Sequence, residues 1–163
     1  MSTARAAAAL LALALGCAPA PPIAETRTSQ PAASEDPVVR ELAERVNAHR
    51  RRLGRPPLQW DARVATVALR HSRNMVERDF FSHQDSQGRS PFDRLDAAGI
   101  RFSKAAENIA SGQRDAASVL DSWLSSAGHR ENLEDPDFTR HGIGRFANHW
   151  THVFIRPPRI RPD

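Results

Sequence analysis

Apolar residues recur at helical spacing through most of the chain, and they change to strand-like alternation only near its end. The first helix is predicted to start at Asp36 and Pro37, because Asp can cap a helix and Pro fits its first position. The apolar residues on its inner face are Val39, Leu42, Val46 and Leu53. Residues 142–146 and 149–155 instead indicate two strands joined by Ala147-Asn148, an antiparallel hairpin. Helices first and a hairpin late predict an α+β domain, with helices packed on a small antiparallel sheet.

Further helices are marked by capping residues along the middle of the chain. They are expected to follow Asp61, Ser90-Pro91 and Asp115, and to end near Arg78, Gly99 and Ser125. His71 lies on the apolar stripe of the first of these helices. A lone histidine in such a position is more often a core residue than a ligand, and we interpret His71 in that way.

The N-terminus has the pattern of an export signal, which we predict to span residues 1–17. Residues 1–9 carry one basic residue and no acidic one, and an alanine/leucine run follows. Cys17, the only cysteine, has a position that resembles the bacterial lipobox, in which the cysteine carries the acyl chains that anchor the protein in a membrane. The alternative is an ordinary signal peptide that is cut near Ala18 or Ala20.

Composition divides the rest of the chain. Residues 18–36 are rich in Pro, Ala and Ser and are expected to be a flexible linker. A folded domain follows at 37–157, and 158–163 form a basic tail. The net charge of +4 is compatible with an anionic lipid or polymer as partner. The basic residues are scattered among acidic ones without a basic-aromatic pattern, so we expect no nucleic acid partner.

The residues best suited to catalysis or metal binding lie near the two ends of the stretch from Phe80 to Asn108. His83 lies near its start and Glu107 near its end, and two later runs contribute His129 and His149. Distant His and Glu residues that converge in space are a common way to build a catalytic or metal site.

Several runs in this order resemble the CAP superfamily, also called the SCP domain, which includes cysteine-rich secretory proteins, antigen 5 and pathogenesis-related proteins. They are Val46-Asn47-Ala48-His49-Arg50, Leu58-Gln59-Trp60-Asp61, Phe81-Ser82-His83, Ala106-Glu107-Asn108-Ile109-Ala110, Ser126-Ala127-Gly128-His129-Arg130, Gly142-Ile143-Gly144 and His149-Trp150-Thr151-His152-Val153-Phe154. The similarity is to the bacterial branch, which lacks disulfides. It implies an α-β-α sandwich, with helices on both faces of the sheet, and an exported monomer of the bacterial envelope, either lipid-anchored or secreted.

The resemblance also implies a cleft lined by two histidines and two acidic residues. His83 and His149 match the two histidines, and Glu107 matches the first acidic residue. The second one is absent, because Leu and Ser follow Trp123. The bacterial Ser-x-Gly-His-Arg run places His129 near the cleft instead.

These residues allow two chemical functions. His83, His129 and His149, with Glu107 as a ligand or as a partner of one, would suit zinc or another divalent cation with an open coordination position. A metal-assisted hydrolase or protease would use Glu107 as general base. The sequence has no nucleophile elbow and no zinc-protease helix, and Cys17 lies outside the domain, so we expect binding rather than catalysis.

Two non-catalytic functions remain. The cleft or a nearby apolar groove could hold a small ligand, a lipid, a sterol or another envelope component. Alternatively the protein is structural and has no ligand, and the polar residues only brace a loop and the hairpin. Strand alternation predicts that His149 and His152 point to opposite faces and do not share a site.

Overall fold

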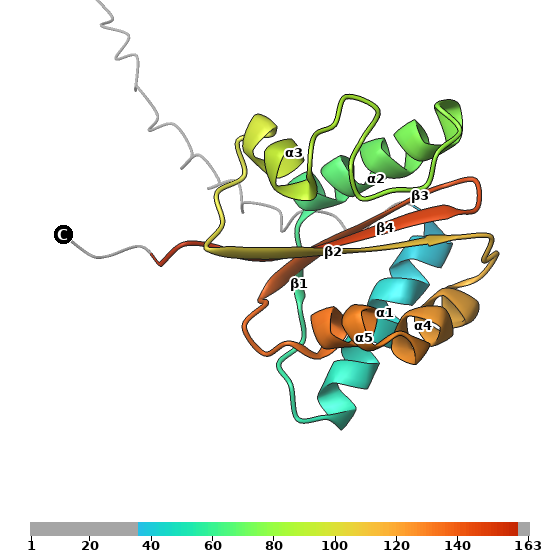
Figure 1. Cartoon of the computed structure of the whole chain (residues 1–163). Coiled ribbons are helices and arrows are strands. Elements are labelled where there is room, and N and C mark those ends of the chain that lie inside the picture. Colours follow the sequence, from blue (N-terminus) through green and yellow to red (C-terminus); the bar gives the residue numbers. More distant parts are fainter. Residues whose placement is uncertain (1–35, 160–163) are drawn as a thin grey trace, which may run out of the picture.

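The computed structural model describes residues 36–159, which form three layers with a sheet between two sets of helices (Figure 1). The elements in chain order are α1 (Pro37–Arg52), β1 (Gln59–Trp60), α2 (Ala62–Glu77), α3 (Pro91–Ala97), β2 (Lys104–Ser111), α4 (Ala116–Ser125), α5 (Ala127–Glu134), β3 (Arg140–Phe146) and β4 (His149–Arg156). Helices α2 and α3 cover one face of the sheet, and α1, α4 and α5 cover the other. The predicted α+β class and sandwich architecture are confirmed.

The helices start where the capping residues predict. The side chain of Asp36 accepts hydrogen bonds from backbone N–H groups at the start of α1, and Asp61 does the same for α2. Ser90 and Asp93 form a reciprocal capping box at the start of α3, and Asp115 accepts from the first turn of α4. Each cap satisfies backbone donors that have no partner within the helix.

The sheet has the strand order β1-β3-β4-β2, so the last strand of the domain lies in its interior. β4 pairs antiparallel with β3, as the hairpin pattern predicts, and also antiparallel with β2, where Glu107 lies opposite Val153. The short β1 pairs parallel with β3, so the sheet is mixed. The sequence pattern predicted neither β1 nor β2.

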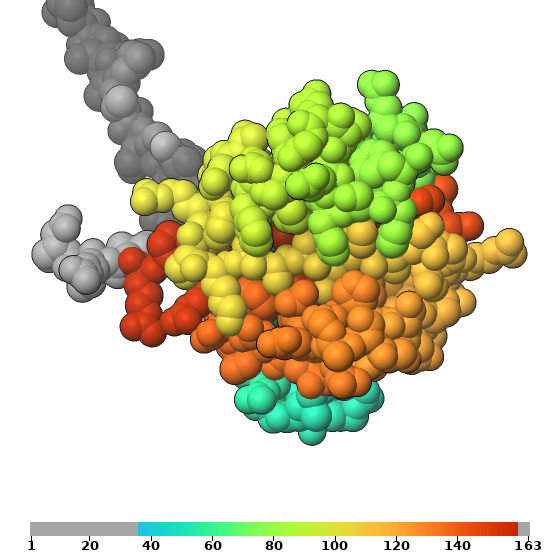
Figure 2. All heavy atoms as spheres, in the orientation of Figure 1, coloured from blue at the N-terminus to red at the C-terminus, as the bar shows by residue number. Residues whose placement is uncertain are grey.

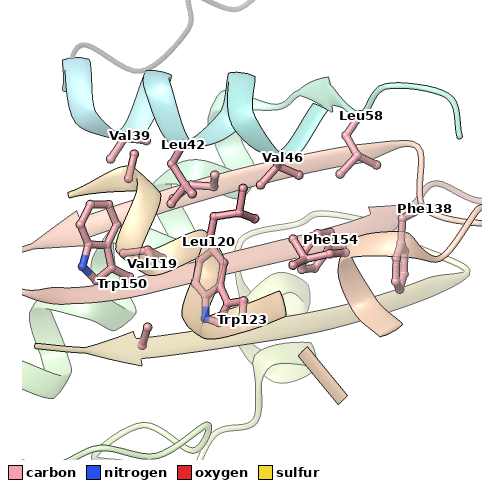
Figure 3. Packing of buried hydrophobic residues seen from close by; sticks show 14 residues of the cluster. Val39, Leu42, Val46, Leu58, Val119, Leu120, Trp123, Phe138, Trp150 and Phe154 are labelled. Carbon is pink, nitrogen blue, oxygen red and sulfur yellow. The ribbon is translucent and has the colours of Figure 1, made fainter. Parts of the chain in front are cut away.

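Two apolar clusters hold the layers together on either face of the sheet. The larger one joins α1 and α4 to the sheet and includes Trp123, Trp150 and Phe154 (Figure 3). The smaller one joins α2 to the other face and includes Val153 and Ile155. β4 therefore sends alternate residues into opposite clusters, which confirms the predicted alternation.

Strand β3 lies directly against α2, and two glycines make this possible. A Cβ atom at Gly144 would lie 2.0 Å from the backbone nitrogen of Leu69, and one at Gly142 would lie 2.1 Å from that of Ala65. Both distances are far below van der Waals contact. Only glycine allows this strand and helix to approach so closely.

Some predictions fall outside the described residues: the export signal with Cys17, the linker as far as residue 35, and the end of the basic tail. Within residues 36–159, no helix is long and apolar enough to cross a membrane.

Candidate functional site

Glu107 is the centre of a polar cluster on the face of the sheet that α2 and α3 cover. It lies in the middle of β2, and its side chain is 2% exposed. A buried carboxylate needs partners that compensate for the lost hydration. Oε2 of Glu107 accepts a hydrogen bond of 2.6 Å from Nη2 of Arg94, and Oε1 accepts one of 2.9 Å from Nδ1 of His83.

Arg94 ties this carboxylate to the surrounding chain. The residue lies on α3, just after the capping box that fixes the start of this helix. Its Nη1 donates to the backbone carbonyls of His83 (2.8 Å) and Arg89 (3.0 Å). One guanidinium group thus holds both the buried charge and the loop that carries His83.

His83 is the exposed member of the cluster, with a side chain that is 50% exposed. Because an ionised carboxylate only accepts hydrogen bonds, Nδ1 of His83 must carry the proton toward Glu107. In the neutral ring Nε2 is then unprotonated, and no described residue forms a hydrogen bond to it. Glu107 therefore holds the ring of His83 in place, and the lone pair on Nε2 faces solvent.

His71 lies beneath the cluster and is almost wholly buried. Nε2 donates to the backbone carbonyl of Ser82 at 2.9 Å and lies 3.9 Å from Oε1 of Glu107. Desolvation by burial lowers the pKa of His71, although the charge of Glu107 opposes this shift. The expectation of a buried core residue is correct, but this residue also lines the polar cluster.

His129 approaches from the other helical layer. It lies in the first turn of α5, and its pKa is lowered by burial and by the nearby charge of His83. Its backbone carbonyl accepts a hydrogen bond of 2.9 Å from Asn108, which in turn accepts one from Asn132. The fully buried Asn108 thereby fastens α5 to β2 beside Glu107.

We call His71, His83, Arg94, Glu107 and His129 the His83–Glu107 site. It occupies the edge of the sheet formed by β2. Figure 2 shows the yellow surface of the β2 region between the green surface of the α2–α3 layer and the orange surface of α5.

His149 is placed differently from the other three predicted site residues. It pairs with Ser111 at the far end of β2, four residues beyond Glu107. Nε2 is 3.1 Å from the hydroxyl of Ser111, and the ring contacts that of Phe81. The fully buried His152 lies on the opposite face, 2.9 Å from His141. The prediction that His149 and His152 serve no common site is thus confirmed.

The donor set for a metal is small at this site. In the described part of the chain, no group of three or more His, Cys, Asp and Glu residues is arranged to hold a metal ion. Both oxygens of Glu107 are engaged by Arg94 and His83. Glu107 is therefore better placed to orient His83 than to bind a cation or to accept a proton as a base.

Sequence reasoning missed the contributions of Arg94 and His71. Arg94 immediately follows the capping box, and a buried cation beside Glu107 is what an isolated buried carboxylate requires. The sequence feature that could have predicted a distant cation is Glu107 itself, because it lies beside apolar residues and has no adjacent basic residue. His71 shares its helix face with the core, so its periodicity alone gave no sign of the site.

Comparison with known proteins agrees with this architecture. A model of the CAP family, described as the cysteine-rich secretory protein family, matches residues 43–152. The chain is 38% identical over 132 residues to the uncharacterized protein YkwD of Bacillus subtilis (strain 168), covering 80% of this chain and 51% of that protein. It is 35% identical over 117 residues to the uncharacterized membrane protein YlbC of the same organism, covering 72% of this chain and 34% of that protein. The chain thus spans about half or less of the length of these relatives.

Solved structures with the same fold include an extracellular protein and an outer surface protein. An extracellular protein containing an SCP domain from Bacillus anthracis str. Ames has a TM-score of 0.71 at 36% identity, with coverage of 72% of this chain and 40% of that one. An outer surface protein from Borrelia burgdorferi has a TM-score of 0.71 at 21% identity, with coverage of 77% and 97%. The second likeness bears on the fold alone.

Proposed function

Because the chain belongs to the CAP family of cysteine-rich secretory proteins, we propose that it is an exported domain of the cell envelope that binds a small ligand at the His83–Glu107 site. The observation that carries this proposal is the half-exposed imidazole of His83, held by a buried carboxylate. With Nδ1 held by Glu107 and half of the side chain exposed, His83 can present Nε2 to a ligand that arrives from solvent.

The location is supported by the similar extracellular protein of Bacillus anthracis, which is 36% identical to this chain. An acylated Cys17 would hold the domain at a membrane, within reach of envelope components. The mass of the N-terminal peptide of the mature protein tests directly whether Cys17 is acylated. A chain that begins after Cys17 would refute the anchor but leave the binding proposal standing.

The ligand can be sought without knowing its identity. We would purify the wild-type protein from the envelope of its own host and weigh it by native mass spectrometry, beside His83→Ala and His49→Ala variants. His49 is the control, because it also bonds a carboxylate, that of Glu134 at 2.9 Å, but in another part of the domain. We expect a bound mass in the wild type and in His49→Ala that is lost in His83→Ala. The same bound mass in all three proteins, or none in any of them, would refute the proposal.

Zinc is a second candidate ligand, favoured by the bond between Nδ1 of His83 and Glu107. Carboxylates commonly hold metal-ligating histidines in this way. Nε2 of His83 and the ring of His129 would hold the ion, and a bound zinc would supply a Lewis acid there. Calorimetric titration with zinc chloride of the wild type, His83→Ala and His129→Ala tests this. Binding that both substitutions leave unchanged would rule out the site. Hydrolysis with Glu107 as base stays a prediction.

A further inference from the structure

A hollow lies on the opposite face of the sheet from the His83–Glu107 site, between α1 and the extended segment that carries β1. Its volume is about 230 Å³, which is enough for a molecule of one or two rings or a short chain. The residues that line it are Arg40, Ala43, Glu44, Asn47, Arg51, Leu58, Trp60 and His141. Ala43, Leu58 and Trp60 give it an apolar wall, and the charged residues lie at exposed positions on α1.

The buried polar residue in this lining is His141, which is 1% exposed. Its Nδ1 lies 2.9 Å from Nε2 of His152, and its ring packs edge-on against that of Trp60. No described residue bonds the other ring nitrogen of His141, Nε2, and His141 is one of the residues that border the hollow. A buried imidazole with one nitrogen that has no protein partner therefore lies beside the apolar wall of the hollow.

The contact between the two histidines decides which atom carries a proton. One ring must donate and the other accept. If His141 donated, Nδ1–H of the fully buried His152 would be a donor without a partner, since this atom has none. Orphaned buried donors are rarer than orphaned acceptors. His152 is thus the donor, and the proton of neutral His141 resides on Nε2, toward the hollow.

We propose that this hollow binds a small, uncharged, mainly apolar molecule that accepts a hydrogen bond from Nε2–H of His141. A ring that bears a carbonyl or a ring nitrogen has this chemistry. A carboxylate fits less well, because it would lose its hydration against Leu58 and Trp60. Burial lowers the pKa of His141, and the buried cation of Arg50 adds a smaller contribution in the same direction. The field of Arg50 also favours the negative end of an acceptor dipole.

Quinoline and naphthalene make a matched pair of probes, because they have nearly the same shape and only quinoline has an acceptor nitrogen. Each would be titrated into the ¹⁵N-labelled full chain at neutral pH while NMR follows the imidazole nitrogens. We expect saturable binding of quinoline, a change in the Nε2 signal of His141, and roughly two- to tenfold weaker binding of naphthalene, the value of one net hydrogen bond.

Ala43→Leu fills the hollow from α1, where leucine suits a helix. Ala97→Leu is its control, since Ala97 is an exposed residue of α3 away from the hollow. We expect quinoline binding to be lost in the first variant and retained in the second, with both variants folded in urea titrations. Four results would each overturn the proposal: no saturation by quinoline, equal affinity for naphthalene, binding unchanged in Ala43→Leu, or equal loss in both variants.

Discussion

Replacement of Arg94 by methionine would leave the carboxylate of Glu107 buried without its cation. The two groups are 2.6 Å apart, and their side chains are 7% and 2% exposed. Removal of one partner of such a pair costs about 3–5 kcal/mol, because the remaining charge is uncompensated. The backbone carbonyls of His83 and Arg89 also lose a donor. We therefore expect Arg94→Met to lower the free energy of unfolding by about 4 kcal/mol, a large part of a typical domain's stability.

The assay is urea denaturation followed by the fluorescence of the buried tryptophans. Arg45→Met is the matched control, because Arg45 and Glu41 are in contact at 2.8 Å but are 47% and 49% exposed. Such a surface pair contributes about 0.5 kcal/mol or less. Adding Glu107→Gln to Arg94→Met removes the stranded charge and should recover about 2 kcal/mol. A loss below about 1 kcal/mol in Arg94→Met, or no recovery in the double variant, would refute this account of the site.

Three further predictions concern packing, pH and the joint between layers. Gly144→Ala should cost about 3 kcal/mol or more, or prevent folding, because its Cβ would overlap α2, whereas Gly128→Ala, in open space on α5, should be neutral or stabilising in the same urea assay. Burial lowers the pKa of His141 to about 3 and that of His152 well below its usual value, so their contribution to stability is present above the unfolded value of about 6.5 and is lost as the pH falls. Between pH 7 and pH 5 this predicts a loss on the order of 2 kcal/mol from His141, with a further loss from His152 in the same direction. Urea midpoints that stay constant over this range would contradict it. Asn108→Ala should increase amide hydrogen exchange in α5 with little change in α2. An equal increase in both helices would argue against a role of Asn108 in attaching α5 to β2.

The sequence was most informative where one residue acts alone. Asp36, Asp61, Ser90 and Asp115 each cap a helix through their own side chain and the next turn of backbone, so local pattern was enough to place the helix starts. The hairpin was also visible, because its strands are neighbours in the chain.

The strands β1 and β2 were missed because their partners are distant. β1 has two residues and is a strand only by virtue of its pairing with β3, about eighty residues later. β2 begins with Lys104-Ala105-Ala106, which has weak strand propensity, and it is fixed by pairing with β4 and by Asn108. His83 and Glu107 could be proposed as partners because they match the cleft residues of the CAP superfamily, whereas Arg94 lies outside the matching runs and became evident only in three dimensions.

The position of β4 has a consequence for the order in which the molecule can assemble. This strand comes last among the described elements, yet both β2 and β3 pair with it. A chain that emerges from a ribosome or an export channel with its N-terminus first would show β2 with no partner strand until β4 appears. Over that interval the edge of β2 is free to pair with other chains. The sheet can therefore be completed only after the C-terminal hairpin has been released.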